Sequence, residues 1–505
     1  MCYTSKDAKP TSKVNILMST HNNYAKNQSL NNQIYIALQK NKLEETIKKL
    51  GVPILDSKLI CRYPWRSIKE IRAGEKILFK FRILMSIMLS LPAGLSYLLY
   101  QQLLIITKPR VKKISKNHIF ISSIIHEGEF HKEMNERNFF WGSIKEFENN
   151  TNTSNCYILI PFKKIKINTL KLAGIHEVVD LRSCRAHFFG IRHFSILIIS
   201  NLFYSIKLIQ LLCRSKEKVR VAGLILEDHK QVLGKDLSAT IYTKLLVSDL
   251  CRLISNQKVF YTCEGQSWEI SLLQKIGTDI KVYAVVHVPM KIADSLISVY
   301  GSLDKLKKPL KLSFLSPGRL SSNLLFGLID KKYPIIEVEA QRFIKKEKVQ
   351  IKLLKKKTVN AISVFLEVDS NCNEELLGII IGCFTQIPAE HVFIYPHPSI
   401  KNIIHKTKFP SFMSLPINYI PTQINLFSPS TSAFIDEIFL GSTIAIYQPV
   451  LGYSPLGFSS MEFYFDNEKA LLDLISRRPV LRKTHIKPIV NLNVNLELWK
   501  KLLSK

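Results

Sequence analysis

The sequence FSPSTSAFIDEIFLG, residues 427–441, sets the interpretation of the whole chain. A short apolar strand at 424–427 is followed by hydroxyl residues and then by a helix. The hydroxyl residues are Ser430, Thr431 and Ser432. Free backbone N–H groups and the macrodipole at such a helix start favour an anion. Because Ser and Thr also cap helices that bind nothing, this stretch needs support from elsewhere in the chain.

A histidine follows a second apolar strand, at residues 392–395, in the sequence PHPS. The carboxyl ends of parallel strands meet at one edge of a sheet, and doubly wound folds bind nucleotides in the crevice there. We therefore expect His397 to donate to a phosphate oxygen of a nucleotide-activated sugar, with Pro398 fixing the loop. Glu437, further along the helix, would reach a ribose hydroxyl or would be an ordinary solvated helix residue.

Apolar strands alternate with helix-compatible segments in two blocks, about 117–300 and about 358–490. Short strands separated by helices indicate βαβ units and a parallel sheet. The simplest fold for this layout is α/β, with two Rossmann-like domains facing each other across a cleft. The expected strands are 117–125, 157–160, 219–226, 259–263, 281–286, 361–368, 392–395, 424–427 and 443–447.

This pattern divides the chain into four segments. Residues 1–116 form an N-terminal extension, 117–302 the first (acceptor) domain and 358–505 the second (nucleotide-sugar donor) domain. Residues 303–357 are dense in lysine, and we interpret them as a solvated basic linker. The alternative is a surface that meets lipid head groups or an anionic acceptor.

The chain is strongly basic. Its 505 residues include 71 Lys and Arg against 40 Asp and Glu, a formal net charge of +31. Such a surface attracts anionic lipid, nucleic acid or phosphorylated ligands. The nine cysteines form no C-x-x-C pair, which argues against a zinc site or a disulfide framework and suits a reducing cytoplasm. The motifs G-x-G-x-x-G, P-loop, H-E-x-x-H and G-x-S-x-G are absent, so their chemistries are unsupported.

The longest apolar run, residues 83–107, has no charged residue and is flanked by Lys and Arg on both sides. Its length would allow a spanning helix, but we expect Pro92 and Gly94 to interrupt it. A re-entrant hairpin or in-plane anchor and a buried helix pair are the alternatives. A second run, 195–206, is too short to span. With no secretory signal peptide at its start, we expect a cytoplasmic protein, peripheral or monotopic at the inner face of the cell membrane.

Three titratable groups follow strands of the first block and compete for the role of catalytic base. Glu264 ends the 259–263 strand in the sequence YTCEGQSWE, and Gly265 lets the chain turn into a helix. His287 ends the next strand, and Asp228 follows an earlier one. A carboxylate at such a strand end could deprotonate a sugar hydroxyl, or it could stabilise a helix N-terminus. The sequence does not choose between Glu264 and Asp228.

Several of these motifs resemble those of known carbohydrate enzymes. EGQSWE followed by VYAVVHVP is similar to the E-x-Q-x-W-E, then His, pattern of bacterial surface-carbohydrate biosynthesis proteins. PHPS and SPSTSAFIDEIFLG look like the His-Pro and Ser/Thr motifs of bacterial sialyltransferase-like and related GT-B glycosyltransferases. FFWGSIKEF (139–147) looks like an N-terminal-domain element of the same group. The acidic-acidic-Gly motif of the sialyltransferases is only half present, because residue 263 is Cys.

The resemblance implies a GT-B fold in which an acid of the N-terminal domain, such as Glu264, is the base. It implies that the donor phosphate is held by His397, Ser430, Thr431 and Ser432. We then expect a metal-independent glycosyltransferase that moves a sugar from a nucleotide sugar to a surface polysaccharide, such as capsule or lipopolysaccharide, or to a lipid-linked glycan. No cofactor beyond the nucleotide-sugar co-substrate is expected, and the donor is open between a CMP-linked acid sugar and other nucleotide sugars.

Two other functions stay open. A transferase of CDP-linked polyol phosphates has a similar architecture, and a non-catalytic basic protein could bind a membrane or a nucleic acid with a degenerate fold. Nucleic-acid binding predicts aromatic side chains among the basic ones. The lysine-rich residues 303–357 include few aromatics, so no nucleic-acid partner is expected.

Overall fold

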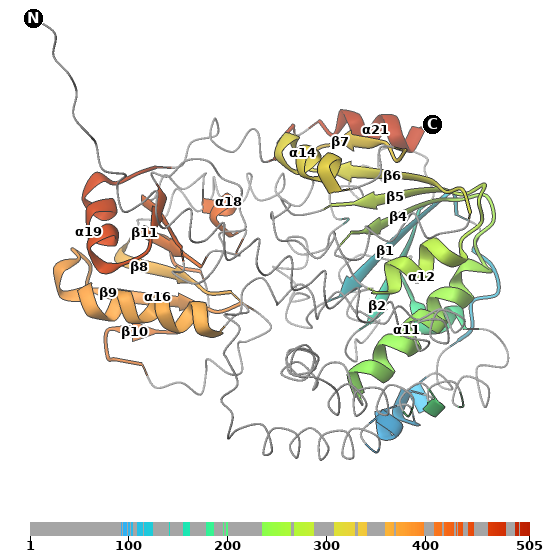
Figure 1. The fold of residues 1–505 in the computed structure, drawn as a ribbon, viewed down its shortest axis with the longest axis horizontal. Coiled ribbons are helices and arrows are strands. Elements are labelled where there is room, and N and C mark those ends of the chain that lie inside the picture. Colours follow the sequence, from blue (N-terminus) through green and yellow to red (C-terminus); the bar gives the residue numbers. More distant parts are fainter. Residues whose placement is uncertain are drawn as a thin grey trace, which may run out of the picture.

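The structure is a computed structural model, and Figure 1 shows its two domains. It describes parts of residues 92–104 and 195–202, and residue 141. Beyond these it describes, with a few single gaps, residues 109–124, 155–161, 178–185, 235–263, 267–286, 308–328, 332–340, 359–367, 370–397, 409–428, 431–437, 443–448, 463–480 and 490–504.

The first domain is built on a parallel sheet of seven strands in the order β3-β2-β1-β4-β5-β6-β7. Its strands are β1 (His118–Ile124), β2 (Asn155–Pro161), β3 (Val178–Asp180), β4 (Lys258–Thr262), β5 (Lys281–Val285), β6 (Lys311–Ser316) and β7 (Ile335–Glu337). The helices that connect them are η3 (Leu181–Cys184), α11 (Lys235–Cys251), α12 (Ser267–Lys275) and α14 (Arg319–Leu328).

An aromatic row holds the centre of the first sheet together. Tyr157, Phe120, Phe260 and Tyr283 are paired residues on four neighbouring strands, so they fall on one face. Their rings stack in sequence with centroid separations of 5.3, 4.9 and 4.7 Å. Parallel strands are buried on both faces, and their continuous apolar sequences reflect this.

The second domain contains a parallel sheet of six strands in the order β10-β9-β8-β11-β12-β13. Its strands are β8 (Val359–Phe365), β9 (His391–Tyr395), β10 (Met413–Ser414), β11 (Thr422–Phe427), β12 (Thr443–Tyr447) and β13 (Tyr464–Phe465). Its helices are α16 (Ser370–Cys383), η5 (Phe384–Gln386), α18 (Ala433–Glu437) and α19 (Glu468–Arg477). The α/β fold with two Rossmann-like sheets is therefore confirmed. Among the expected strands, 219–226 lies outside the described residues.

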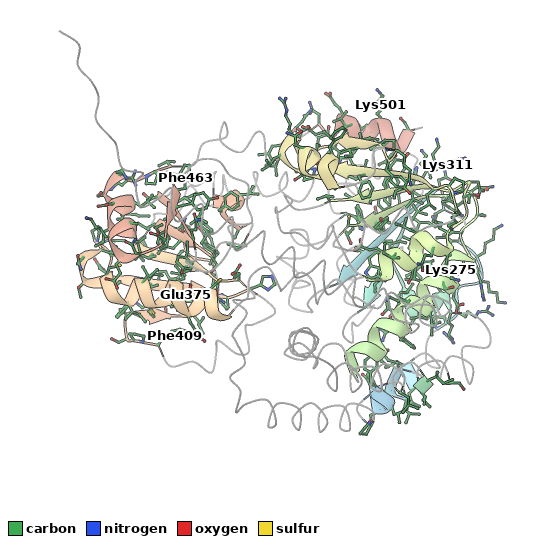
Figure 2. All side chains as sticks on the ribbon, in the orientation of Figure 1. Lys275, Lys311, Glu375, Phe409, Phe463 and Lys501 are labelled. Atoms are coloured by element: carbon green, nitrogen blue, oxygen red, sulfur yellow. The ribbon has the colours of Figure 1, made fainter. Side chains whose placement is uncertain are left out.

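The basic linker expected at 303–357 is corrected by the structure. Residues 311–337 form β6, α14 and β7, which extend the first sheet at one edge. The lysines dominate the composition of this stretch, but the strand β6 buries the apolar residues Leu312, Phe314 and Leu315. Its first residue, Lys311, lies on the outer side of the first domain, away from the second domain (Figure 2). The acceptor-domain boundary at 302 is therefore too early.

The last helix of the chain belongs to the first domain, not to the second domain as expected. Helix α21 (Glu497–Ser504) packs on the first sheet, although the sequence placed residues 358–505 in the second domain. Buried Trp499 lies 6.0 Å from the Phe260 ring, between centroids. The carboxylate of Glu339 accepts from the Leu498 and Trp499 N–H groups at 2.9 and 3.3 Å and so caps the helix start. The indole N–H of Trp499 donates to the carbonyl oxygen of Glu339 at 2.9 Å.

The described part of the apolar run 83–107 is helical at residues 92, 94–97, 99–101 and 103–104. Pro92 and Gly94, expected to interrupt a helix, both have helical backbone. Proline is compatible with a helix where its missing N–H would make no intrahelical bond. Within the described residues, no helix is long and apolar enough to cross a bilayer.

Candidate active site at the carboxyl edges of the two sheets

The carboxyl edge of the second sheet contains the candidate donor site. The chain adds β9 and β10 on one side of β8 and then places β11 on the other side. The strand order therefore reverses between β8 and β11, which is where doubly wound sheets bind ligands. Residues just beyond β8, β9 and β11 border this position.

Three aromatic residues stack on one another at the strand ends that form this edge. Phe365, Tyr395 and Phe427 are the last residues of β8, β9 and β11, and they lie in register. The Phe365 ring stacks on Tyr395 at 5.0 Å and on Phe427 at 4.8 Å, between centroids. This packing fixes the strand ends, so the loops that follow begin from rigid positions.

His397 lies just past one of these strand ends. It is the second residue after β9, and it is half-buried. Because β9 and β11 flank β8, their ends are two strand spacings apart, about 10 Å. A ligand seated over the end of β8 would therefore touch the loops after both neighbouring strands. His397 and Thr431, the described residues of the His-Pro segment (397–398) and the Ser/Thr segment (430–432), follow strands that end at the same edge of this sheet.

Thr431, after β11, makes a local turn and caps α18. Its backbone N–H donates to the Ser428 carbonyl oxygen at 3.3 Å. Its Oγ1 accepts from the Ala433 N–H at 3.2 Å. The capping role, one of the two open interpretations of this stretch, is thus observed. A role of Thr431 in binding phosphate stays a proposal.

A buried hydrogen-bond network that the sequence analysis missed connects the loops around the reversal point. Asn373, in the first turn of α16, accepts through Oδ1 from the Glu367 N–H at 3.0 Å and from Ser428 Oγ at 3.0 Å. Its Nδ2 donates to the Glu367 carbonyl oxygen at 2.8 Å. All three residues are buried. Asn373 thus fastens the start of the Ser/Thr loop to the loop after β8.

The first sheet has the corresponding reversal between β1 and β4, because β2 and β3 lie on one side of β1 and β4 to β7 on the other. Glu264 is separated from β4 only by Cys263, and His287 from β5 only by Val286. The Cys263 N–H donates to the Val285 carbonyl oxygen at 2.8 Å, so β4 and β5 remain paired up to this edge. Figure 1 draws the arrows of β4 to β6 pointing toward the second domain.

Polar atoms are buried on both sides of the turn that contains Glu264. In the part of the chain that the structure describes, Thr262 Oγ1 and Trp268 Nε1 are buried and make no hydrogen bond. Such groups are costly, and they occur where a ligand or water completes the bonding. Glu269, the other acid of this motif, is fully buried in the first turn of α12. Its burial makes it a poor candidate for the base that meets an acceptor.

Several predicted site residues lie outside the described residues. These are Asp228, Glu264, His287, Pro398, Ser430 and Ser432, and the side chain of Glu437, whose backbone ends α18. Cys263 and Val286, the described residues that precede Glu264 and His287 in the sequence, lie at the carboxyl edge of the first sheet. Asp228 has no described strand beside it.

The two domains meet beside α18. Ala340, past the end of β7, is buried in one hydrophobic cluster with Phe434 of α18, and Leu320 of α14 packs against that cluster. Arg319, the first residue of α14, is exposed next to Leu320. Arg319 is thus the immediate neighbour of a residue that packs against the cluster containing Phe434 of α18. The sequence did not single out Arg319, because this residue lies in the lysine-rich stretch. The pattern that could have indicated it is an apolar strand followed by the residues SPGR.

No protein-family model and no curated protein matches the sequence. Among solved structures, UDP-GlcNAc 2-epimerase from Neisseria meningitidis bound to UDP-GlcNAc is similar, with 12% identity, a TM-score of 0.43, and coverage of 77% of this chain and 100% of that one. UDP-N-acetylglucosamine 2-epimerase from Rickettsia bellii has 6% identity, a TM-score of 0.46 and coverage of 77% and 96%. A glycosyltransferase from Rickettsia africae has 11% identity, a TM-score of 0.40 and coverage of 77% and 98%. At such identities the likeness concerns the fold alone.

Proposed function

We propose that this chain is a glycosyltransferase that moves a sugar from a nucleotide-sugar donor to a glycan or lipid-linked acceptor of a bacterial surface polysaccharide. One observation carries the proposal: in each sheet, a candidate segment follows a strand at the point where the strand order reverses. Glu264 follows β4 in the first sheet, and the Ser/Thr segment follows β11 in the second. Ligands of doubly wound folds bind at such reversals.

The proposed reaction is a direct displacement. An acceptor hydroxyl oxygen attacks the anomeric carbon, the bond from that carbon to the phosphate oxygen breaks, and Glu264 takes the hydroxyl proton. The departing nucleotide keeps the bond electrons as negative charge on its phosphate. His397 and the hydroxyl residues Ser430, Thr431 and Ser432 would stabilise that charge, with Pro398 holding the loop and Glu437 near the ribose. Arg319 adds a cation from the first domain.

A second transferase activity would use the same architecture. In it the group transferred is a polyol phosphate from a CDP-linked donor, so the bond that breaks lies within the diphosphate rather than at an anomeric carbon. The positive groups at the edge of the second sheet would serve either reaction, because both leave a nucleotide phosphate. Mass spectrometry of the product separates the two, since only the second adds phosphorus to the acceptor.

The donor site is tested by nucleotide binding. A thermal-shift screen against CMP, CDP, UDP, GDP and their sugars should find a ligand that raises the unfolding temperature, because it binds only the native state. His397→Ala should weaken that ligand about tenfold or more, through loss of a charge-assisted hydrogen bond. His391→Ala is the matched control, because His391 lies at the opposite end of β9 and bonds Ser414 Oγ at 2.7 Å. Equal affinity of both variants would contradict the proposed donor site.

The base is tested separately. Glu264→Gln should keep nucleotide binding but lose turnover by about a hundredfold or more, the usual contribution of a positioned general base. Activity is measured as nucleotide release in the presence of acceptor. Full activity of this variant would move the base to Asp228, and Asp228→Asn would then show the loss. His287→Gln distinguishes a substrate contact, which raises KM, from a proton carrier, which lowers kcat.

A further inference from the structure

The helical segment at residues 92–104 presents its apolar side to solvent. Its exposed positions follow each other at helical spacing, so they form one face. They are Pro92, Ser96, Leu99, Tyr100 and Leu103. Leu99 is 57% exposed, Tyr100 44% and Leu103 64%. Helices on the surface of a protein normally turn such residues inward.

The opposite side of this segment faces the first domain. Gly94 is buried, and Tyr97, Gln101 and Leu104 are half-buried. The hydroxyl of the buried residue Tyr242, in α11, donates to the Gln101 carbonyl oxygen at 3.4 Å. The segment is therefore attached to α11 through a side that includes polar groups, and Leu99 and Leu103 lie on the outward side.

A second helical segment repeats this arrangement. Residues 195, 198–199 and 202 are helical, and the exposed positions are Ser195, Ile199 and Leu202, again at helical spacing. Ile199 is 45% exposed and Leu202 43%. Figure 1 draws both short helical pieces at the lower end of the first domain, below α11. Two separate parts of the chain thus expose aliphatic residues from the same domain.

Positive charge accompanies the first segment. Between Glu75 and Glu127 the sequence includes eight Lys and Arg and no Asp or Glu. Lys112 and Lys113, which follow the helical segment, are both exposed. Exposed aliphatic side chains, followed in the sequence by lysines without acidic residues, match a phospholipid surface, which offers hydrocarbon below a layer of negative head groups. A single-stranded nucleic acid would instead require several aromatic side chains for stacking, and Tyr100 is the single exposed aromatic on the described faces.

We propose that the exposed faces of residues 92–104 and 195–202, here called the apolar face, bind in the plane of a bilayer that contains anionic phospholipid. Leu99, Leu103, Ile199 and Leu202 enter the boundary between head groups and acyl chains. Lys112 and Lys113 pair with the phosphates of the head groups. This binding is independent of the proposed sugar transfer, because it uses none of the residues at the carboxyl edges of the sheets.

The test is cosedimentation of the full chain with sucrose-loaded vesicles of phosphatidylglycerol and phosphatidylcholine. The double variant Leu99→Gln/Leu103→Gln should lower the partition coefficient about tenfold or more. Ile381→Gln is the matched control, because Ile381 is similarly exposed (47%) but lies on α16 of the second domain. Unchanged partitioning of the double variant would overturn the proposal.

The contribution of lysine charge to vesicle binding is tested with a second double variant. Lys112→Gln/Lys113→Gln should reduce binding severalfold on vesicles with phosphatidylglycerol and leave the weaker binding to pure phosphatidylcholine unchanged. Lys469→Gln/Lys501→Gln removes two exposed lysines from α19 and α21 and should have no effect. Equal losses of vesicle binding in these two double variants would mean that the total charge of the protein, and not the lysines next to the apolar face in the sequence, attracts it to the vesicles.

Four further measurements test insertion, folding and the alternative partners. Leu103→Trp should show a blue shift of fluorescence when phosphatidylglycerol vesicles are added, whereas a tryptophan that remains in water overturns insertion. Nucleotide-induced thermal shifts retained by Leu99→Gln/Leu103→Gln show that its loss of vesicle binding is not caused by unfolding.

Two other outcomes would assign a different partner to the apolar face. If the wild type is a dimer in sedimentation velocity that Leu99→Gln/Leu103→Gln separates, and neither protein binds vesicles, the partner is a second copy of the chain. If the wild type shifts RNA in a gel, Lys112→Gln/Lys113→Gln abolishes that shift and neither protein binds vesicles, the partner is a nucleic acid.

Discussion

At the scale of single residues, Asn373 shows how a buried amide can organise a site. Its carboxamide oxygen accepts from two donors, the Glu367 N–H and Ser428 Oγ, and its amide donates to the Glu367 carbonyl oxygen. No charge is involved, so the network fixes loop geometry without an ion-pair desolvation cost.

Asn373→Ala should lower the free energy of unfolding by about 1–3 kcal/mol, because buried donors lose this acceptor. The measurement is urea unfolding followed by circular dichroism. Asn373→Asp, which keeps the acceptor and loses the donor, should also lose the bond to the Glu367 carbonyl and loosen the same loops. A milder Ser428→Ala variant should cost about 1 kcal/mol. An Asn373→Ala variant as stable as the wild type would contradict the structural role assigned to this network.

His118 should make stability depend on pH. It is buried at the start of β1, with Nδ1 donating to Asn155 Oδ1 at 3.0 Å. Burial lowers the pKa of its imidazole below the ordinary 6.5, and nearby Lys258 lowers it further, against the opposing effect of the Asn155 hydrogen bond. The unfolded chain therefore binds a proton near pH 6.5 that the folded chain resists.

The sign follows from this difference. Above pH 6.5 the imidazole is neutral in both states and has no effect, whereas below it the free energy of unfolding falls by at most about 1.4 kcal/mol per pH unit. His118→Gln should flatten this part of the profile, measured as denaturant midpoints between about pH 5 and 7. The same slope in both proteins would show that other groups cause the dependence.

At the scale of elements, α21 is a piece of the first domain made by the end of the chain. Trp499→Ala should cost about 3–5 kcal/mol, the usual effect of removing a buried tryptophan. Leu498→Ala, at the neighbouring and 37% exposed position, is the control and should change stability by about 0.5 kcal/mol or less. Both are measured by denaturant unfolding. Comparable losses in the two variants would mean that the helix, and not the buried indole, stabilises the sheet.

At the scale of the whole molecule, the described residues show where the chain leaves the first domain and where it returns to it. It leaves the first domain after Ala340 and returns at Asn491, whose carbonyl oxygen accepts from the Ala340 N–H at 2.7 Å. The Asn491 N–H donates to the Pro317 carbonyl oxygen at 2.6 Å. The points of departure and return therefore lie side by side, and Ala340 belongs to the buried cluster that contains Phe434 of the second domain.

Much of the fold was readable from local sequence. The strand expected at 443–447 is β12 (Thr443–Tyr447), and the strand expected at 281–286 is β5 (Lys281–Val285). Strands buried on both faces give short apolar runs between polar loops, and that signal survives without any knowledge of neighbours. His397 and the Ser/Thr stretch were found for the same reason, since polar residues directly after an apolar strand stand out.

By itself, the sequence determined that the protein is α/β with two parallel sheets, and it located strands β4, β5, β9, β11 and β12. The tertiary structure decided the order of the strands, and with it the reversal points beside Glu264 and Thr431. It also decided that β6 joins the first sheet and that α21 returns to it. Strand order and helix docking depend on contacts between residues far apart in the chain, and such contacts leave no pattern in a local window. The network around Asn373 was hidden for this reason as well.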